Sequence, residues 1–277
     1  MAVATDTLER AVLAALAEDI GAGDVTTEAT VPENAVGTAE LLVKEPGVVC
    51  GLRAAESTFR ALDPDIRFEA LANDGDVIDE PPALVARVAG SERAILTGER
   101  VALNFLGRLS GIATLTRRYV EAVDGTGAAV LGTRKTTPGL RALEKHAVAV
   151  GGGRNHRFGL DDAVLVKDNH LRAAGSVADA VRLVRAASDL PIEVECETLT
   201  QVAEVLGADV DAILLDNMTL AELREAVALA AGRARLEASG GVSLDTIRAI
   251  AETGVDEISV GALTHSARSL DVSLELT

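Results

Sequence analysis

The feature that most constrains the fold is a regular alternation of short apolar runs and helical segments in the second half of the chain. The apolar runs, which are separated by segments of helical periodicity, lie at residues 128–132, 163–166, 192–195, 212–215, 235–238 and 257–260. Successive strand-helix units of this kind place parallel strands in one sheet whose faces are covered by helices. We therefore predict an α/β barrel or partial barrel of six parallel strands, with an open doubly wound sheet as the alternative.

Capping signals support the helices between these strands. Thr137-Pro138 precedes a helical segment that stops at Gly151, and we expect this dipeptide to cap the helix. Thr219 and Glu222 have the spacing of a capping box, in which each side chain binds the main-chain N–H of the other.

The first ninety residues show a different pattern, in which short strands and helices are mixed. We predict helices over 8–17 and 53–62, and strands at 38–43, 47–51, 66–71 and 83–89. A long helical stretch begins at Ser91, and Gly107 and Gly111 predict a kink or a break in it before a second helix over 112–123. The first part is therefore an α+β domain, and the domain boundary falls within this helical region.

Composition excludes several classes of protein. The formal net charge is −17, whereas nucleic-acid binding normally requires a broad basic surface. No apolar run approaches the length of a membrane span, and the N-terminal segment carries acids and lacks the basic start of a signal peptide. Cys50 and Cys196 are too few for a disulfide framework, so we expect a cytoplasmic protein.

One stretch is basic, although the chain as a whole is acidic. Residues 134–172 hold eight Arg or Lys against four acids, and three of the four lysines of the chain lie there, namely Lys135, Lys145 and Lys167. A local cluster of cations on an acidic protein predicts a small polyanionic ligand.

Polar residues gather at the carboxyl ends of the predicted strands, which in a parallel barrel meet at one mouth. Cations follow the first two strands, carboxylates the third and fourth, and glycines the last two, in the order Arg134-Lys135, Lys167, Glu195, Asp216, Ser239-Gly240-Gly241 and Gly261. Glycine turns before helices let main-chain N–H groups approach a phosphate, although a tight turn alone explains one such motif equally well. Two of them, on the last two strands, favour a phosphate site.

Glu195 and Asp216 are predicted to end neighbouring strands. Two carboxylates there suit Mg²⁺, which prefers oxygen ligands and binds phosphates at the same time. The alternative is a salt bridge to Lys135 or Lys167, and both arrangements are compatible. His156 lies on a loop beside Arg157, where it could add a donor for an anion, although a lone histidine is more often structural.

Long motifs then resemble one family along essentially the whole chain. The sequence is similar to the quinolinate phosphoribosyltransferases, also called nicotinate-nucleotide pyrophosphorylases, in TRKTTPGLRALEKHAVAVGGGRNHR, LVKDNH, ILLDN, LEASGG, SVGALTHSA, EDIGAGDVTT and GERVALNFLGRLSGIAT. The resemblance implies an N-terminal α/β sandwich domain over 1–110, to which 268–277 return, and an open α/β barrel over 111–267. It implies a homodimer, with a higher oligomer also possible.

The resemblance also implies the reaction. Quinolinate and phosphoribosyl pyrophosphate would give nicotinate mononucleotide, pyrophosphate and CO₂ in NAD biosynthesis, with Mg²⁺ and without an organic cofactor. By motif, the quinolinate carboxylates would meet Arg134, His156 and Arg157, with Arg100 reaching in from the partner subunit. Lys135 and Lys167 would contact both substrates and, with Glu195 and Asp216, carry the catalysis. Those two carboxylates would hold the ribose and the metal, and the 5′-phosphate would lie against Ser239, Gly240, Gly241 and Gly261.

Two other functions compete with this one. A paralogue could keep the phosphoribosyl site and take another heterocyclic acid, but the cluster of Arg100, Arg134, His156 and Arg157 provides for two carboxylates. A non-catalytic binder of phosphorylated metabolites would not need the full set of carboxylates and lysines at the barrel mouth.

Overall fold

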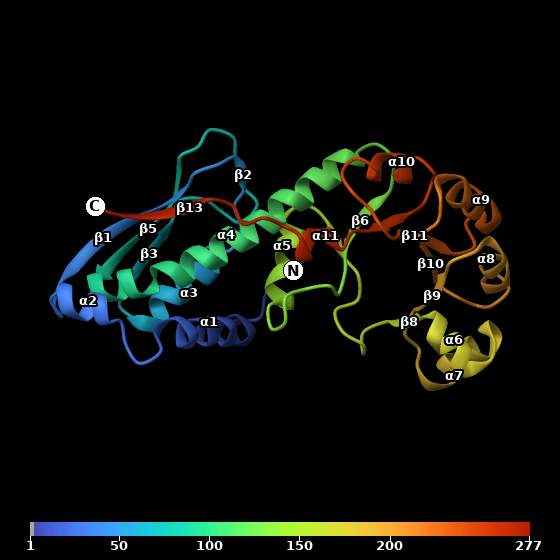
Figure 1. Ribbon diagram of the computed structural model, residues 1–277, viewed down its shortest axis with the longest axis horizontal. Coiled ribbons are helices and arrows are strands. Elements are labelled where there is room, and N and C mark those ends of the chain that lie inside the picture. The colour runs from blue at the N-terminus through green and yellow to red at the C-terminus, as the bar shows by residue number, and fades with distance from the viewer. Residues whose placement is uncertain (1–2) are drawn as a thin grey trace. The chain divides into compact units, whose positions relative to one another are not determined.

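The computed structural model describes residues 3–277, which form two compact units (Figure 1). The first unit contains the chain up to Arg117 together with Thr136–Gly152 and Ser266–Thr277, and the second contains Arg118–Lys135 and Gly153–His265. None of the helices in residues 3–277 combines the length and the apolar character needed to cross a lipid bilayer.

An antiparallel sheet forms the centre of the first unit. Its strand order is β13-β1-β5-β3, with β1 at Val36–Val43, β3 at Arg67–Ala70, β5 at Ala83–Ser91 and β13 at Val272–Leu276. Alternate residues of β1, namely Ala39, Leu41 and Val43, are fully buried, as expected for a sheet with one face on the core. The C-terminal strand β13 pairs with β1, so the end of the chain completes this sheet.

The first unit also contains helices. They are α1 (Thr5–Ile20), α2 (Val25–Thr30), α3 (Leu52–Leu62), α4 (Glu92–Ala122) and α5 (Arg141–Val150), and a small sheet pairs β2 (Gly47–Val48) with β4 (Val77–Ile78). Phe59 of α3 and Ile95 and Leu106 of α4 are fully buried in the same cluster as the β1 side chains. These contacts make one hydrophobic core.

The predicted break at Gly107 and Gly111 is wrong, because α4 is one continuous helix. The two glycines serve a close approach of the C-terminal segment. A Cβ at Gly111 would lie 1.9 Å from the carbonyl oxygen of Arg268, and one at Gly107 would lie 2.8 Å from that of Leu270. Glycine therefore marks a crossing of two main chains and not a helix end.

The predicted cap of α5 is also corrected. The N-cap residue is Leu140, and the Thr137 hydroxyl donates to the Glu144 side chain, at 2.8 Å from Oε1, instead of accepting a main-chain N–H of the first turn. The sequence pattern found the helix and its end at Gly151 but not the residue that starts it.

The second unit is a parallel sheet with helices around it. Its strand order is β7-β6-β12-β11-β10-β9-β8, with β6 at Ala129–Gly132, β7 at Arg154–Asn155, β8 at Val164–Val166, β9 at Ile192–Cys196, β10 at Ala212–Asp216, β11 at Arg235–Ser239 and β12 at Glu257–Ser259. The helices are α6 (Asp168–Ala174), α7 (Val177–Ala187), α8 (Leu199–Val205), α9 (Leu220–Ala230), α10 (Ile247–Ala251) and α11 (Ala262–His265).

The strand order confirms the predicted half-barrel and rules out the alternative, an open doubly wound sheet. The first strand, β6, pairs with the last, β12, while β7 and β8 form the two edges and leave the barrel open. The sheet has seven strands and not the six that were predicted. The additional strand, β7, has only two residues, both exposed, so it has no apolar run that the sequence could reveal.

Candidate active site

The predicted acidic strand ends are neighbours in the second unit. β9 and β10 pair in parallel, which brings Glu195 and Asp216 to the same edge of the sheet. Lys167 directly follows β8, the other neighbour of β9, and its Nζ forms a salt bridge with Glu195 Oε2. The structure therefore contains the ion pair that was considered as an alternative to metal binding.

The residues that follow β10 and β11 contact each other, and this contact explains why position 240 is glycine. The main-chain N–H of Asn217 donates to Ser239 O at 2.8 Å, and the Asn217 side chain donates to Asp216 Oδ2 at 2.8 Å. A Cβ at Gly240 would lie 2.2 Å from Asn217 Oδ1, and Gly240 has a φ of 101°. Only glycine fits there, whereas the space beside Gly241 is open.

The ends of β6 and β12 also meet. The Thr264 hydroxyl donates to Lys135 O at 2.7 Å, and a Cβ at Gly261 would lie 3.2 Å from Lys135 Cδ. The stem of Lys135 therefore passes over Gly261, and its exposed ammonium group belongs to the same edge as the glycine turns. A cation beside exposed main-chain N–H groups is suited to a phosphate.

Arg134 and Arg157 form the cationic part of the site. Burial and the nearby charge of Arg134 lower the pKa of the Arg157 guanidinium from its ordinary value. Arg157 Nη1 donates to Ala163 O at 3.2 Å, which orients the group. Two guanidinium groups close enough to repel each other are stabilised by an anion between them, and their planar forks suit carboxylates.

His156 is held at both ring nitrogens. Its Nε2 lies 2.7 Å from Glu193 Oε2 and 3.5 Å from Glu237 Oε2, and its Nδ1 accepts the main-chain N–H of Arg157 at 2.8 Å. The sequence reasoning did not assign a role to Glu193 or Glu237. Their signal was available, since each is an acid at an interior position of an apolar strand and is buried.

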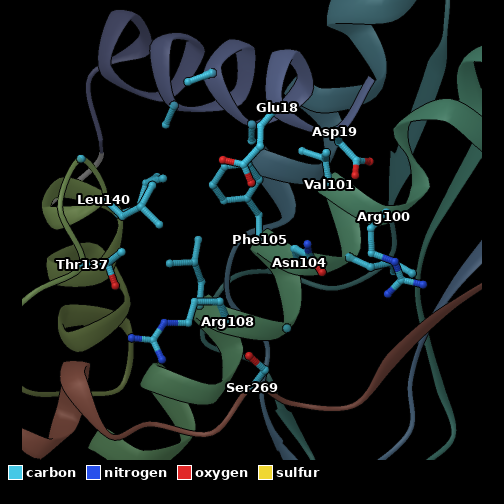
Figure 2. A pocket seen from close by; sticks show the side chains of 18 of the residues that line it. Glu18, Asp19, Arg100, Val101, Asn104, Phe105, Arg108, Thr137, Leu140 and Ser269 are labelled. Carbon is cyan, nitrogen blue, oxygen red and sulfur yellow. The ribbon is translucent and has the colours of Figure 1, made fainter. Parts of the chain in front are cut away.

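Arg100 belongs to the first unit, on α4, and not to the second. It lines a hollow of about 1020 Å³ in that unit, together with Glu18, Asp19, Asn104 and Arg108 (Figure 2). The hollow lies among α1, α4, the 137–143 segment and the 269–272 segment. Strand-end reasoning could not have found Arg100, because it lies on a helix of the other unit.

Several groups of side chains in the structure could act as ligands of a metal ion. Among residues 3–277, groups of three ligand atoms occur at Cys50–Asp74–His146 and at His156–Glu193–Glu237, and neither contains Glu195 or Asp216. Mg²⁺ is commonly held by one or two carboxylates, with substrate phosphates and water completing its shell. The pair Glu195 and Asp216 meets this requirement as an oxygen donor set at the barrel mouth.

The half-barrel places the chain in the class of α/β-barrel proteins, whose functional sites lie at the carboxyl ends of the strands. Models of the quinolinate phosphoribosyl transferase C-terminal and N-terminal domains match residues 112–275 and 24–110. The chain belongs to the quinolinate phosphoribosyltransferase family. This confirms the resemblance on which the sequence expectations rested.

Individual relatives agree with the family models. A probable nicotinate-nucleotide pyrophosphorylase [carboxylating] of Synechocystis is 46% identical, over 94% of this chain and 90% of its own length. The nicotinate-nucleotide pyrophosphorylase of Mycobacterium leprae is 45% identical, over 99% and 97%. The crystal structure of NadC from Streptococcus pyogenes has a TM-score of 0.95 at 43% identity, covering 100% of this chain and 99% of that one.

Proposed function

We propose that the residues at the mouth of the half-barrel carry the reaction of the family in this chain. The reaction transfers phosphoribosyl from phosphoribosyl pyrophosphate to quinolinate, with decarboxylation, and gives nicotinate mononucleotide, pyrophosphate and CO₂. The observation that supports the site most is the meeting of cations, carboxylates and glycine turns at one edge of the sheet.

Arg134 and Arg157 bind the two carboxylates of quinolinate. Burial and, second to it, the charge of Arg134 lower the pKa of Arg157, and an anion that lies between the two groups relieves their repulsion. Arg100 adds a third guanidinium, contributed by the partner subunit of a homodimer. The large hollow around Arg100 supports this arrangement, because a surface hollowed to this extent can receive part of a second copy.

The phosphoribosyl substrate lies over the glycine turns. Ser239, Gly240, Gly241 and Gly261 offer main-chain N–H groups to the 5′-phosphate, and the Lys135 ammonium beside Gly261 adds charge. Glu195 and Asp216 face the ribose, on which positive charge develops as the bond from C1 to pyrophosphate breaks.

Mg²⁺ bound to Glu195 and Asp216 would neutralise the charge of the pyrophosphate. Lys167, which is paired with Glu195, stabilises the same leaving group and orients that carboxylate. The ring nitrogen of quinolinate then forms the bond to C1 of the ribose.

Decarboxylation needs no organic cofactor. The positively charged pyridinium accepts the electron pair released when the bond to the adjacent carboxylate breaks, and the ring carbon then takes a proton. The task of the protein is to orient that carboxylate and keep water away from it. A cytoplasmic location forms part of the same proposal.

An assay with quinolinate, phosphoribosyl pyrophosphate and Mg²⁺ tests it, with nicotinate mononucleotide and CO₂ followed together. Equal formation of both products is expected, and Asp216→Asn should lower the rate while the thermal unfolding midpoint stays close to that of the original protein. Folded protein that binds phosphoribosyl pyrophosphate but forms neither product would contradict the proposal. Other heterocyclic acids would then be tested in place of quinolinate.

A further inference from the structure

A buried polar cluster lies beneath the cationic site, inside the second unit. Glu193 of β9, Glu237 of β11 and Ser259 of β12 are each at most 7% exposed, and among residues 3–277 they are the buried polar residues of this sheet's strands. The Ser259 hydroxyl donates to Glu237 Oε1 at 2.5 Å. The cluster therefore ties three strands of the sheet together through side chains.

The ring of His156 contacts both carboxylates of the cluster. Since Nδ1 of the ring accepts the Arg157 N–H, its hydrogen lies on Nε2 and is donated to Glu193 Oε2 at 2.7 Å. Glu237 Oε2 lies on the other side of the same nitrogen at 3.5 Å. With both ring nitrogens occupied in this way, the imidazole connects the barrel interior to the main chain of Arg157.

The segment that carries Arg157 is held by other contacts as well: Arg157 Nη1 donates to Ala163 O at 3.2 Å, and the main-chain N–H groups of Phe158 and Gly159 donate to Asp162. The segment follows β7, the two-residue edge strand, and enters a loop in which Phe158 and Leu160 are exposed. The main-chain N–H of His156 donates to Gly132 O at 3.0 Å, which is the end of β6. The ring contacts add a link between the main chain of Arg157 and Glu193 inside the sheet.

Stability alone does not account for the cluster. Two neighbouring buried carboxylates are unfavourable, and well-packed apolar side chains are often as stable or more so. Burial and the charge of Glu193 raise the pKa of Glu237 to about 8. Glu193 Oε1 is buried without a hydrogen-bond partner among the described residues, so packing alone does not explain its place in the sheet.

We propose that Glu193, Glu237 and Ser259 are positioning residues for quinolinate binding, which hold the main chain of Arg157 through the His156 ring. This inference rests on the proposed function, since it assumes that Arg157 binds a quinolinate carboxylate. It goes beyond the role expected for His156 from the sequence, which was to bind a quinolinate carboxylate, because here the ring also acts on Arg157.

The first test compares Glu193→Ala with Glu193→Gln in steady-state kinetics. Glu193→Ala should raise the KM for quinolinate at least about tenfold, the order expected for losing a hydrogen bond to a charged group. The KM for phosphoribosyl pyrophosphate and kcat should stay within about twofold of the original values. Glu193→Gln keeps an acceptor for the Nε2 hydrogen and should restore most of the quinolinate affinity.

A matched control separates positioning from stability. Asp211, at the opposite end of the same strands, accepts Ile192 N–H at 2.7 Å and pairs with Arg185 at 2.9 Å. Asp211→Ala should lower the thermal unfolding midpoint without changing the KM for quinolinate. An equal rise of this KM in Asp211→Ala would show that the effect follows lost stability, and the inference would be overturned.

A double-mutant cycle tests the route through Arg157. Arg157→Ala should itself raise the KM for quinolinate, and adding Glu193→Ala to it should have almost no further effect, because both act on one contact. Additive effects would overturn the inference while leaving Arg157 in the site. An unchanged KM in Arg157→Ala would instead overturn the proposed quinolinate site, and this inference with it.

If Glu193→Ala does not fold, Ser259→Ala carries the test. It removes one hydroxyl, leaves both carboxylates in place and should raise the KM for quinolinate about threefold, the order of a neutral hydrogen bond. An unchanged KM in folded Ser259→Ala would contradict the role of the cluster.

Discussion

Glu144 is fully buried, and Arg108 reaches it with two donors, Nε at 3.2 Å and Nη2 at 2.9 Å from Oε1. Arg108 Nη1 also donates to Ala267 O at 2.8 Å, and Thr137 donates to Glu144 from both its main chain and its hydroxyl. One ion pair thereby joins α4, the segment before α5 and the C-terminal segment. The sequence had suggested no role for Arg108.

Arg108→Met should destabilise the first unit strongly, because it leaves the buried Glu144 without its cation. We expect a loss of about 3–5 kcal/mol in the free energy of unfolding, measured with denaturant. Arg60→Met is the control, since Arg60 pairs with Glu56 on the exposed face of α3 and should lose no more than about 0.5 kcal/mol. Equal losses in the two variants would contradict this account.

Gly111→Ala should also be destabilising, although alanine is the better helix former by about 1 kcal/mol. Its Cβ would lie 1.9 Å from the Arg268 carbonyl oxygen, so two main chains must separate, at about 1–3 kcal/mol or more. Gly98→Ala on the same helix meets only side-chain atoms of Leu62 and Phe59, at 3.0 Å, and should lose less. The thermal unfolding midpoints of the two variants measure these losses. A midpoint of Gly111→Ala above that of the original protein would refute the argument that two main chains cross at Gly111.

The free energy of unfolding should depend on pH because the pKa of Glu237 is raised in the folded state. Burial and Glu193 raise its pKa in the folded state from the ordinary 4.5 to about 8, while His156 and Ser259 oppose the shift. Between these values the folded state holds the proton that the unfolded state has lost. Its contribution to stability is therefore complete below pH 4.5, decreases as the pH rises and is lost above about 8.

Glu237→Gln, which cannot ionise, should show a shallower decrease over this window, by up to about 1.4 kcal/mol per pH unit. Denaturant unfolding of both proteins at several pH values measures this decrease in the free energy of unfolding. Parallel pH profiles for Glu237→Gln and the original protein would rule out a raised pKa at Glu237.

Arg134→Ala should weaken quinolinate binding more than turnover, because it removes one of two guanidinium groups for the carboxylates. A loss of about 1.5–3 kcal/mol corresponds to a rise of roughly 10- to 150-fold in the KM for quinolinate. Arg154→Ala, an exposed arginine of the adjacent strand β7, is the matched control and should leave this KM unchanged. An unaltered KM in Arg134→Ala would remove Arg134 from the acid site.

Sharing of the site across a homodimer makes a separate prediction. Mixing Arg100→Ala chains with Lys135→Ala chains should restore part of the activity, because one of the two sites in a mixed dimer regains both residues. The activity of each variant alone, measured at the same total concentration, is the baseline. No recovery in mixed dimers verified by mass would argue against a contribution of Arg100 from the partner.

The barrel could be predicted because local sequence carries its signal. The run 212–215, for example, is apolar throughout, since a strand buried on both faces needs no polar positions, and it is β-strand in the structure. The position of Glu195 and Asp216 at one edge then followed from parallel strands alone. β7 could not be found in this way, because a two-residue edge strand exposes both of its side chains.

The sequence by itself determined the order of the elements, the family and the residue types at the strand ends, because these depend on neighbours along the chain. Only the tertiary structure decided what Gly111 faces, that Arg108 belongs to Glu144, and that Glu193 and Glu237 meet at the ring of His156. Those contacts join residues 36 to 157 positions apart. Their geometry depends on how separate strands and helices pack, which no local pattern of residues encodes.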